Sequence, residues 1–202
     1  MNLYKLPVHK KSPKTVNSIV EIPKGTNVKY EYDNNLGVFK YDRSLTSAFM
    51  YPCSYGFIPS TLSDDGDALD ILIYNSTPIQ TGTLVECKVI GVLDMEDDGD
   101  KDYKILGVPI SHVRRHYSLK QIDPMFLKIA SNFFAHYKDL ETGKWVELGG
   151  WEDAEQAADL IKKSINKKTA NAALLYLFNF LKVDKPIYRK PKMLSSLYYF
   201  LT

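Results

Sequence analysis

The sequence is poor in cysteine and has no long hydrophobic segment. Cys53 and Cys87 are its two cysteines, and they lack the close CxxC spacing of zinc sites. This argues against a disulfide framework and indicates a cytoplasmic protein with reduced thiols. The longest nearly apolar run, Ala172–Leu181, contains Asn179 and is shorter than the roughly 20 residues that span a bilayer, so no membrane association is expected. Residues 1–16 lack the apolar core of a secretory signal.

Charge is distributed unevenly along the chain. The formal net charge is only +2 at pH 7. Residues 162–202 nevertheless carry nine Lys or Arg and a single acid, Asp184, so the preceding part of the chain is acidic. An acidic body suits metal binding better than nucleic-acid binding. Nucleic acid is therefore not expected as a partner.

The most distinctive stretch is the acidic segment Ser63–Asp70, which leads directly into the apolar run Ile71–Tyr74. It holds four aspartates and one glycine, which permits a sharp turn, and the apolar run after it is typical of a buried strand. If the backbone is extended, Asp65 and Asp67 point the same way. Asp70, at the entrance of the strand, can turn toward the same point.

Clustered carboxylates of this kind predict a cation site. Two carboxylates about 4 Å apart repel each other by about 4 kcal/mol at an effective dielectric constant near 20. A bound cation relieves that repulsion, and oxygen ligands suit Mg²⁺, Mn²⁺ or Ca²⁺ rather than zinc. The alternative is a solvated acidic turn without a ligand. The buried strand behind the loop favours the metal site.

Hydrophobic periodicity predicts short strands followed by helices. We expect strands at Ser18–Pro23, Val28–Tyr32, Val38–Tyr41, Ile71–Tyr74, Leu84–Leu93 and Lys104–Ile110. We expect helices at Pro124–His136, which has an apolar stripe, and at Glu152–Ser164, which opens with acids suited to the helix dipole. Strands first and helices last predict an α+β domain around a small barrel.

Other charged and aromatic side chains are placed to meet the same pocket. In the second acidic run, Asp94–Lys104, alternation puts Asp102 and Lys104 on one face. Lys29 and Glu31 likewise share a strand face, although a solvated ion pair is an equally simple interpretation. The tyrosines of the rigid segment at 49–59 are either core residues or hydroxyl donors to an anion.

Taken together, these motifs resemble soluble family I inorganic pyrophosphatases of the bacterial type. The family signature Asp-x-Asp-x-x-Asp stands here at 65–70 with an apolar residue on each side of its last acid. Further matches are Glu-Ile-Pro at 21–23, Lys-Tyr-Glu at 29–31, Asp-Arg at 42–43, Tyr-Pro-Cys-x-Tyr-Gly at 51–56, Asp-Asp at 97–98, Asp-x-Lys at 102–104 and His-Tyr-Lys-Asp-Leu at 136–140. The resemblance covers roughly Ser18–Trp151.

The resemblance implies a fold and a reaction. The fold would be an OB-like five-stranded β-barrel with helices packed on it and the site in the barrel mouth. The reaction would be hydrolysis of inorganic pyrophosphate to two orthophosphates by a Mg-activated water, without a covalent intermediate. Several Mg²⁺ ions would bind per site, with Mn²⁺ or other divalent ions as possible substitutes.

The resemblance also implies a role for each matched side chain. Asp67 would be the general base, and Asp70 would be shared by two metal ions. The metal ligands would be Asp65, Asp70, Asp97, Asp102, Glu31 and, more remotely, Glu21. The phosphates would be held by Lys29, Arg43, Tyr55, Lys104, Tyr137 and Lys138. Asp98 is a further candidate ligand, one methylene shorter than the Glu of many bacterial relatives, and Ala68 replaces the usual Pro or Glu.

The C-terminal region extends beyond the resemblance. Residues 1–166 are expected to form the pyrophosphatase domain, and 167–202 a helical, basic and apolar extension. Its two apolar clusters, at 172–178 and 197–201, would be liable to aggregate if exposed, so we expect them to pack on the domain or on a neighbouring subunit. The resemblance implies a homo-oligomer, with a hexamer favoured.

Two alternatives from other functional classes stay open at this point. One is a non-catalytic OB-type module that binds single-stranded nucleic acid on the aromatics and lysines, which the fourteen tyrosines keep in view. The other is a divalent-ion buffer, although the basic side chains near the acids would weaken cation binding. Phosphate release from pyrophosphate, with and without EDTA, discriminates among the three.

Overall fold

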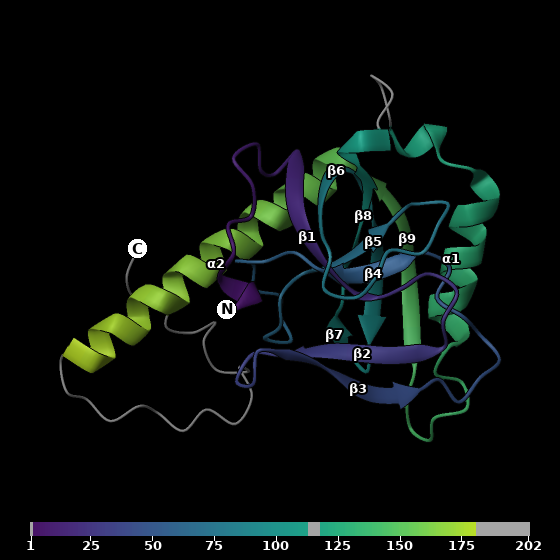
Figure 1. The fold of residues 1–202 in the computed structure, drawn as a ribbon, viewed down its shortest axis with the longest axis horizontal. Helices are drawn as coiled ribbons and strands as arrows, with labels where there is room; N and C mark the ends of the chain where they lie inside the picture. The colour runs from purple at the N-terminus through teal and green to yellow at the C-terminus, as the bar shows by residue number, and fades with distance from the viewer. Residues whose placement is uncertain (1, 113–117, 181–202) are drawn as a thin grey trace.

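The computed structural model describes residues 2–112 and 118–180, and of residues 174–180 the backbone only. Its strands are β1 (Thr15–Ile22), β2 (Val28–Asp33), β3 (Val38–Ser44), β4 (Ser54–Phe57), β5 (Asp70–Ile73), β6 (Leu84–Asp97), β7 (Asp100–Lys101), β8 (Lys104–Pro109) and β9 (Val146–Asp153). Its helices are α1 (Pro124–His136) and α2 (Ala154–Phe180), with short 3-10 turns at Leu3–Lys5, Ile110–His112 and Leu119–Gln121. Figure 1 shows their arrangement.

Five strands close into a barrel. The pairing runs β1–β4–β5–β8–β6, and β6 pairs in turn with β1, so each of the five has two neighbours in the ring. The β5–β8 pair is parallel, and the other four pairs are antiparallel. The long β6 extends beyond the ring, where β7 and β9 pair with it. The expected five-stranded α+β barrel is confirmed.

The hairpin of β2 and β3 forms a separate two-stranded sheet. Figure 1 shows it lying across one end of the barrel, near β7. Tyr32 and Phe57 of this side pack with Ile19 in a small apolar cluster, which holds the hairpin against the barrel. The hairpin therefore covers one mouth of the barrel and faces the strand ends there.

Helix α1 spans the expected residues. Asp123 accepts a hydrogen bond from the Met125 N–H at 2.9 Å, and Pro124 occupies the first turn, where its missing N–H costs nothing. The helix buries Ala130, Phe133 and Phe134. These side chains join the larger apolar core, which also holds barrel residues of β4, β5, β6 and β8.

Helix α2 differs from its expected bounds. It begins at Ala154 rather than Glu152 because β9 continues through Asp153, whose side chain then accepts from the Glu155 N–H at 2.8 Å. It continues past Ser164 to Phe180, and neither Gly nor Pro occurs between Ala154 and Pro186 to end it. The helix thus crosses residue 166 without interruption, and the expected extension beyond residue 180 lies outside the described residues.

Three strands escaped sequence analysis: β4, β9 and the two-residue β7, which forms only by pairing with the end of β6. Strand β4 is short, and its Gly56 lies so close to β1 that a Cβ there would come within 1.8 Å of the Ile19 carbonyl oxygen. Strand β9 contains two adjacent glycines, which weaken the strand pattern, and it forms by pairing with the outer half of β6. Among the described residues no helix is both long and apolar enough to cross a membrane.

Candidate active site

A cavity of about 300 Å³ lies between the barrel and the β2–β3 hairpin. It gathers side chains from β1, β2, β4, β5, the end of β6, β8 and the segment after α1. Twelve of the fourteen expected site residues line it: Glu21, Lys29, Glu31, Tyr55, Asp65, Asp67, Asp70, Asp97, Asp102, Lys104, Tyr137 and Lys138. The fold thus brings together residues that are more than 100 positions apart in the sequence.

The acidic loop reaches the cavity through a turn rather than an extended backbone. Gly66 has φ +98°, a backbone angle that residues with a side chain rarely adopt. The Ser63 N–H donates to the Asp67 carbonyl at 2.7 Å, and the Asp67 N–H donates to Asp65 Oδ1 at 2.9 Å. The turn places Asp65 and Asp67 on the cavity wall, as expected, although by another backbone path.

Lys104 forms the floor of the cavity. The parallel pairing of β5 with β8 sets Asp70 beside Lys104 in the register. The Lys104 ammonium donates to Asp70 at 2.6 Å and to Asp102 at 2.5 Å, and it lies 3.2 Å from the Tyr55 hydroxyl. Lys104 is only 3% exposed, so this is a buried cation held by two carboxylates. Tyr55 also donates to Asp70, at 2.5 Å.

The protonation behaviour of these groups follows from their crowding. Burial opposes the charge of Lys104, but the carboxylates of Asp70 and Asp102 outweigh it and raise the pKa of the lysine. Partial loss of water raises the pKa of Asp67, and the charges of Asp65 and Asp70 raise it further. Burial likewise raises the pKa of Asp102. The site therefore combines a fixed ammonium ion with carboxyls that hold protons more readily than usual.

The opposite wall is formed by the end of β6 and the segment that follows α1. The Lys138 ammonium forms an ion pair with the Oδ2 atom of Asp97. The other oxygen of Asp97, Oδ1, is buried and has no hydrogen-bond partner among the described residues. Tyr137 is buried beside it, and burial raises the pKa of its phenol. A buried, unsatisfied carboxylate oxygen calls for a ligand.

The hairpin wall is formed by Lys29 and Glu31. The two side chains pair at 2.6 Å, and Lys29 also lies 3.6 Å from Asp42. Glu21 lies deeper and accepts the Tyr32 N–H at 2.9 Å. Burial raises the pKa of Glu21 to about 8 despite that hydrogen bond. Glu21 thus anchors the hairpin to β1 as well as facing the cavity.

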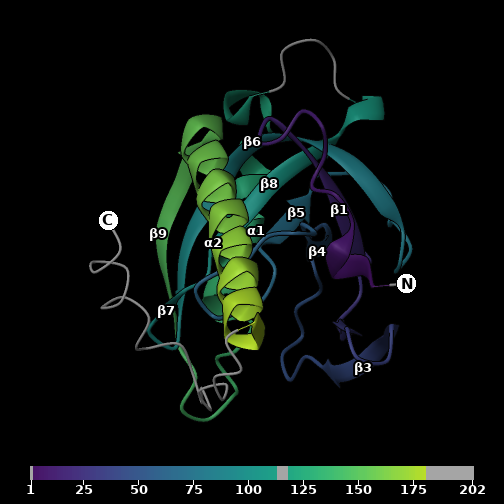
Figure 2. The same ribbon diagram turned by 90° about the vertical axis from the view of Figure 1, so that its left-hand side faces the viewer.

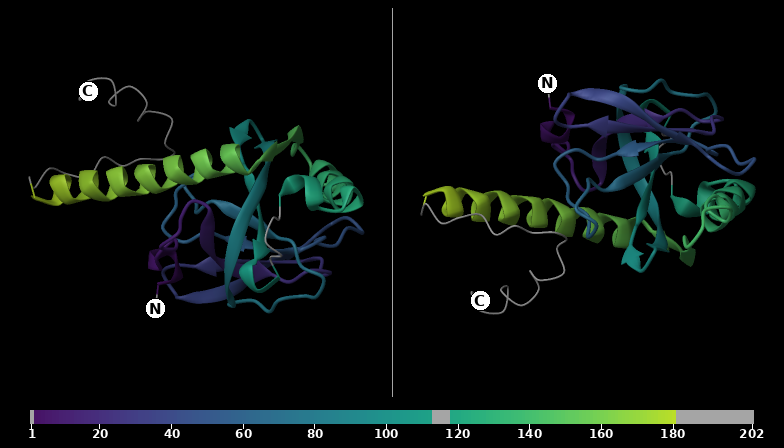
Figure 3. Two further views of the ribbon diagram at one scale, coloured as in Figure 1. Left: turned by 90° about the horizontal axis from the view of Figure 1, so that it is seen from above. Right: turned by 90° about the horizontal axis from the view of Figure 1, so that it is seen from below.

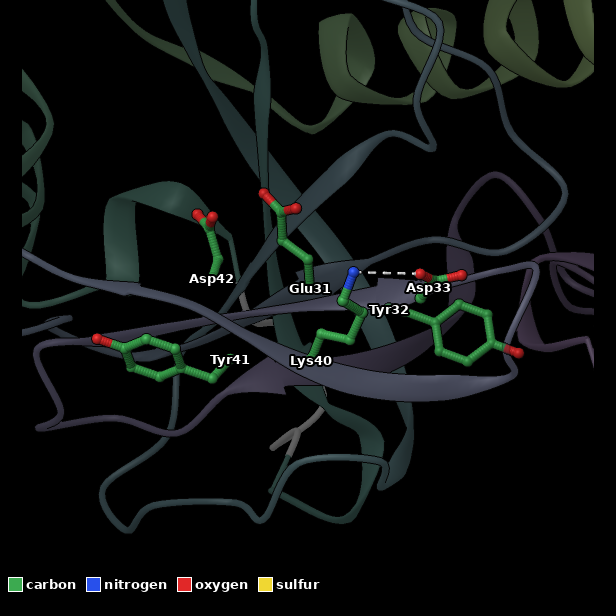
Figure 4. A pocket seen from close by; sticks show the side chains of 6 residues that line it. All are labelled: Glu31, Tyr32, Asp33, Lys40, Tyr41 and Asp42. Atoms are coloured by element: carbon green, nitrogen blue, oxygen red, sulfur yellow. Dashed lines mark ion pairs between the residues drawn. The ribbon is translucent and has the colours of Figure 1, made fainter.

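A second, smaller hollow of about 180 Å³ lies on the hairpin itself. Figure 4 shows the carboxylates of Glu31 and Asp42 pointing the same way from the two strands, while Lys40 reaches Asp33 at 3.4 Å. Glu31 and Tyr32 line both hollows, so the two share a wall on β2.

Arg43 and Asp98 do not line the cavity. Arg43 follows Asp42 on β3 and pairs with it at 2.9 Å, with Glu141 3.7 Å away. Asp98 sits in the turn after β6 and binds Lys144 at 2.5 Å and the Trp145 N–H at 3.1 Å. Arg43 therefore stands at the rim of the site, whereas the Asp98 carboxylate is engaged outside it.

Four tyrosines of the cavity, Tyr4, Tyr30, Tyr32 and Tyr51, were not assigned a role from the sequence. Tyr51 is 4% exposed and packs 5.6 Å from Tyr55 between ring centroids. The Tyr-Pro-Cys-x-Tyr-Gly motif signalled this residue without separating core from site. Tyr4 arrives from the N-terminal 3-10 turn and packs on Phe57 at 4.5 Å. No local pattern around Tyr4 announces that contact.

The donor set suits hard divalent cations. In the described part of the chain, no three Asp, Glu, His or Cys side chains converge closely enough to hold a metal ion. The reason is visible in the ion pairs, since Lys104 separates Asp70 from Asp102 and Lys138 occupies Asp97. Carboxylate oxygens alone line the acidic wall, and such oxygen donors fit Mg²⁺ or Mn²⁺. A cation that binds Asp70, Asp102 or Asp97 would therefore compete with these ammonium groups.

Comparison with known proteins identifies the fold and the family. Residues 18–169 match the inorganic pyrophosphatase family. The inorganic pyrophosphatase of Rhodospirillum rubrum is 43% identical over 176 residues, which cover 85% of this chain and 98% of the relative. The crystal structure of inorganic pyrophosphatase from Thermus thermophilus aligns with a TM-score of 0.80 at 39% identity, covering 84% of this chain and 99% of that one. The Coxiella burnetii structure aligns with a TM-score of 0.76 at 41% identity, covering 80% and 99%.

The closed barrel and its acidic, lysine-floored cavity define the class of protein, an α+β barrel of OB-like architecture. Within that class the chain belongs to the inorganic pyrophosphatase family.

Proposed function

We propose that the protein hydrolyses inorganic pyrophosphate to two orthophosphate ions by direct attack of water. The observation that carries this proposal is the 300 Å³ cavity, in which a carboxylate wall faces buried and half-buried lysines. Pyrophosphate is a polyanion, so its hydrolysis needs cations around both phosphates and a base for the water. Membership of the pyrophosphatase family supports the same substrate.

The carboxylates are proposed to hold Mg²⁺, with Mn²⁺ as a substitute. Asp65, Asp70 and Asp102 would hold the first ion, and Asp70 would be shared with a second. Asp97 has a buried oxygen without a hydrogen-bond partner in the described part of the chain, which would meet an ion that arrives with the substrate, and Glu31 would support another. When bound, the ions supply positive charge to the phosphates and lower the pKa of water. Glu21 is the most remote candidate, because its carboxylate already accepts the Tyr32 N–H.

Asp67 is proposed as the general base. It faces the cavity between Asp65 and Asp70 on the chain, and among the described residues no donor contacts its carboxylate. Its free carboxylate can therefore take the proton of the attacking water. Partial loss of water raises the pKa of Asp67, which makes its carboxylate a stronger base than that of an ordinary aspartate.

The basic and phenolic side chains are proposed to bind the phosphates. Lys104 lies at the floor, Lys138 and Lys29 on opposite walls, and the Tyr55 and Tyr137 hydroxyls beside them. Because Lys104 and Lys138 pair with acids in this structure, substrate and cations would exchange partners on binding. Arg43 at the rim would reach the outer phosphate, once released from Asp42.

Phosphate release tests the function. The purified full-length chain should release orthophosphate from pyrophosphate with Mg²⁺ and should lose that activity in EDTA. Restoring excess Mg²⁺ should recover it, which controls for irreversible unfolding by the chelator. A folded protein that releases no phosphate above buffer with Mg²⁺ would overturn the proposal.

The location and the assembly of the protein are proposed from its thiols and from the family resemblance. Both thiols are free and buried, in keeping with a cytoplasmic protein. A hexamer is proposed from the family resemblance, and size-exclusion chromatography with light scattering tests it.

Figures 1 and 3 show the end of α2 running clear of the barrel, and residues 168–170, 172 and 173 are exposed. We therefore propose that the extension 167–202 packs on a neighbouring subunit, so that deleting 183–202 lowers the oligomer mass or the melting temperature.

A further inference from the structure

Helix α2 backs the loop that carries Asp65 and Asp67. Figure 2 shows the helix in front of the barrel. Its Ala157 and Ile161 are fully buried in the apolar cluster that also holds Ile58 and Leu69, the residues on either side of the loop. The loop and the helix therefore share one patch of core, although about 100 residues separate them in sequence.

The two ends of the loop are fixed by the barrel side of that core. The Ile58 N–H donates to the Leu69 carbonyl at 2.9 Å. Thr61 is buried and joins both ends, donating to the Ile58 carbonyl at 2.5 Å and accepting from the Leu69 N–H at 2.9 Å. This clamp holds the base of the loop but does not reach its tip.

The tip of the loop is fixed by α2. The Leu62 N–H donates to the carbonyl of the buried Ser164 at 3.2 Å. Three residues further along the same helix face, the Lys167 ammonium donates to the Ser63 carbonyl at 2.9 Å and to Asp64 at 2.7 Å. In the described part of the chain, these are the hydrogen bonds that join Leu62–Asp64 to another element.

The Ser63 backbone connects Lys167 to the expected metal ligands. The Ser63 carbonyl that accepts from Lys167 belongs to the residue whose N–H donates to the Asp67 carbonyl, which closes the turn. Inside that turn the Asp67 N–H holds Asp65 Oδ1. A shift at Ser63 would thus alter the separation of Asp65 and Asp67.

Building on the metal-dependent hydrolysis proposed above, we propose that Lys167 is a positioning residue for the metal-binding loop. It would act through the Ser63 carbonyl and Asp64, without touching substrate or metal. Lys167 is half-buried at the point where α2 leaves the body, since residues 168–170 are exposed. A contact that fixes the exposed end of α2 would therefore also affect the position of the loop through Lys167.

The direction in which metal affinity changes when the Lys167 ammonium is removed distinguishes a positioning role from a purely electrostatic one. A nearby ammonium repels cations, so its removal alone would tighten metal binding. Loss of the hydrogen bonds that hold the loop would instead weaken binding, because the free loop must be ordered when the ion arrives. The two roles predict opposite shifts for the same substitution.

The test uses Lys167→Gln in the full-length protein, with Mn²⁺ binding followed by electron paramagnetic resonance. We expect a Kd for Mn²⁺ that is about three- to tenfold higher, the scale of one or two hydrogen bonds. The amides of Ser63 and Asp67 should exchange hydrogen faster. Lys167→Arg, which keeps the charge and a donor, should restore the Kd to within about twofold. Lys168→Gln, an exposed neighbour, is the matched control and should change neither readout.

These experiments test the role of Lys167 independently of the proposed hydrolysis of pyrophosphate. Tighter or unchanged Mn²⁺ binding in Lys167→Gln would overturn the positioning role, as would an equal weakening in Lys168→Gln. If Lys167→Gln fails to fold, Asp64→Asn breaks the same ion pair from the exposed loop. Because losing a carboxylate weakens cation binding by charge alone, the readout for this variant is hydrogen exchange, and unchanged exchange at Ser63 and Asp67 would overturn the proposal. Metal binding and hydrogen exchange are measured without pyrophosphate, so they decide the role of Lys167 even if the wild-type protein releases no phosphate.

Discussion

The two acidic runs of the chain have similar compositions and different structures. In the first, Ser63–Asp70, three of four aspartates line the cavity, and only Asp64 is turned outward to Lys167. In the second, Asp94–Lys104, Asp97 and Asp102 line it, whereas the other acids do not. The first run is a loop folded over the cavity, and the second is the end of a strand and a turn whose side chains alternate.

Within the second run, the direction of each side chain explains which acids line the cavity and which do not. Asp94 and Asp98 are neutralised by Lys101 and Lys144 on the outside of the sheet, at 2.9 and 2.5 Å. Asp97 and Asp102 are neutralised by lysines that themselves line the cavity. A dense run of acids therefore does not define a site. The partner cation and the face of the strand decide which carboxylates can meet a ligand.

The largest effect is expected at Asp67, the proposed base in the first run. Asp67→Asn removes the proposed proton acceptor while keeping the shape of the side chain, so kcat should fall by roughly 10²–10⁴-fold. Affinity for Mn²⁺ should stay within about threefold of wild type, because other side chains are the proposed ligands. Steady-state phosphate release and metal titration measure the two quantities. Turnover within threefold of wild type would remove Asp67 from this role.

The next effect concerns Lys104, where the two runs meet. Lys104→Met leaves the carboxylates of Asp70 and Asp102 side by side without their shared cation. Unpairing a buried charge typically costs about 3–5 kcal/mol, so the free energy of unfolding in EDTA should fall by about that amount. Mg²⁺ should recover part of the loss, because a bound cation can replace the ammonium. Urea unfolding with and without Mg²⁺ tests this, and an equal deficit in both conditions would show that the pair of acids does not bind the ion.

How much of this was predictable depends on the distance between the interacting residues. Asp102 and Lys104 were expected on one face by alternation, and both line the cavity, where they pair at 2.5 Å. Strands β4, β7 and β9 and the length of α2 were not expected, because they depend on pairing with β1 and β6 or on the absence of a helix breaker. Tyr4 reaches the cavity wall through contacts with residues that are distant in sequence, so no local sequence pattern predicts its position.

The resemblance pointed to cavity residues that local patterns could not bring together. Lys138 and Asp97 lie 41 residues apart and meet only because α1 packs against the end of the barrel. Periodicity placed each on its own element without relating them. Asp98 shows the converse, since it adjoins Asp97 in the motif but is engaged by Lys144 in the structure.

A third prediction compares two neighbours within the second run. Asp102→Asn should raise the Mg²⁺ concentration for half-maximal activity by at least about tenfold, since even groups that only orient a ligand cost that much. Asp100→Asn should leave it within about twofold, because Asp100 is exposed on β7 and does not line the cavity. Equal shifts in the two titrations would mean that the run acts only as a diffuse negative field.

The smallest effect is expected at Asp98. Its carboxylate accepts from Lys144 and from the Trp145 N–H, and its backbone has φ +52°, a conformation that asparagine tolerates better than most residues. Asp98→Asn keeps the acceptor for Trp145 and loses only the exposed ion pair with Lys144, which is of a kind that contributes little. The Mg²⁺ requirement should therefore stay within about twofold of wild type. Lys144→Gln is the matched control, because it breaks the same ion pair without touching a carboxylate. If Asp98→Asn raised the Mg²⁺ requirement as Asp102→Asn does while Lys144→Gln did not, Asp98 would have to turn into the cavity when metal binds.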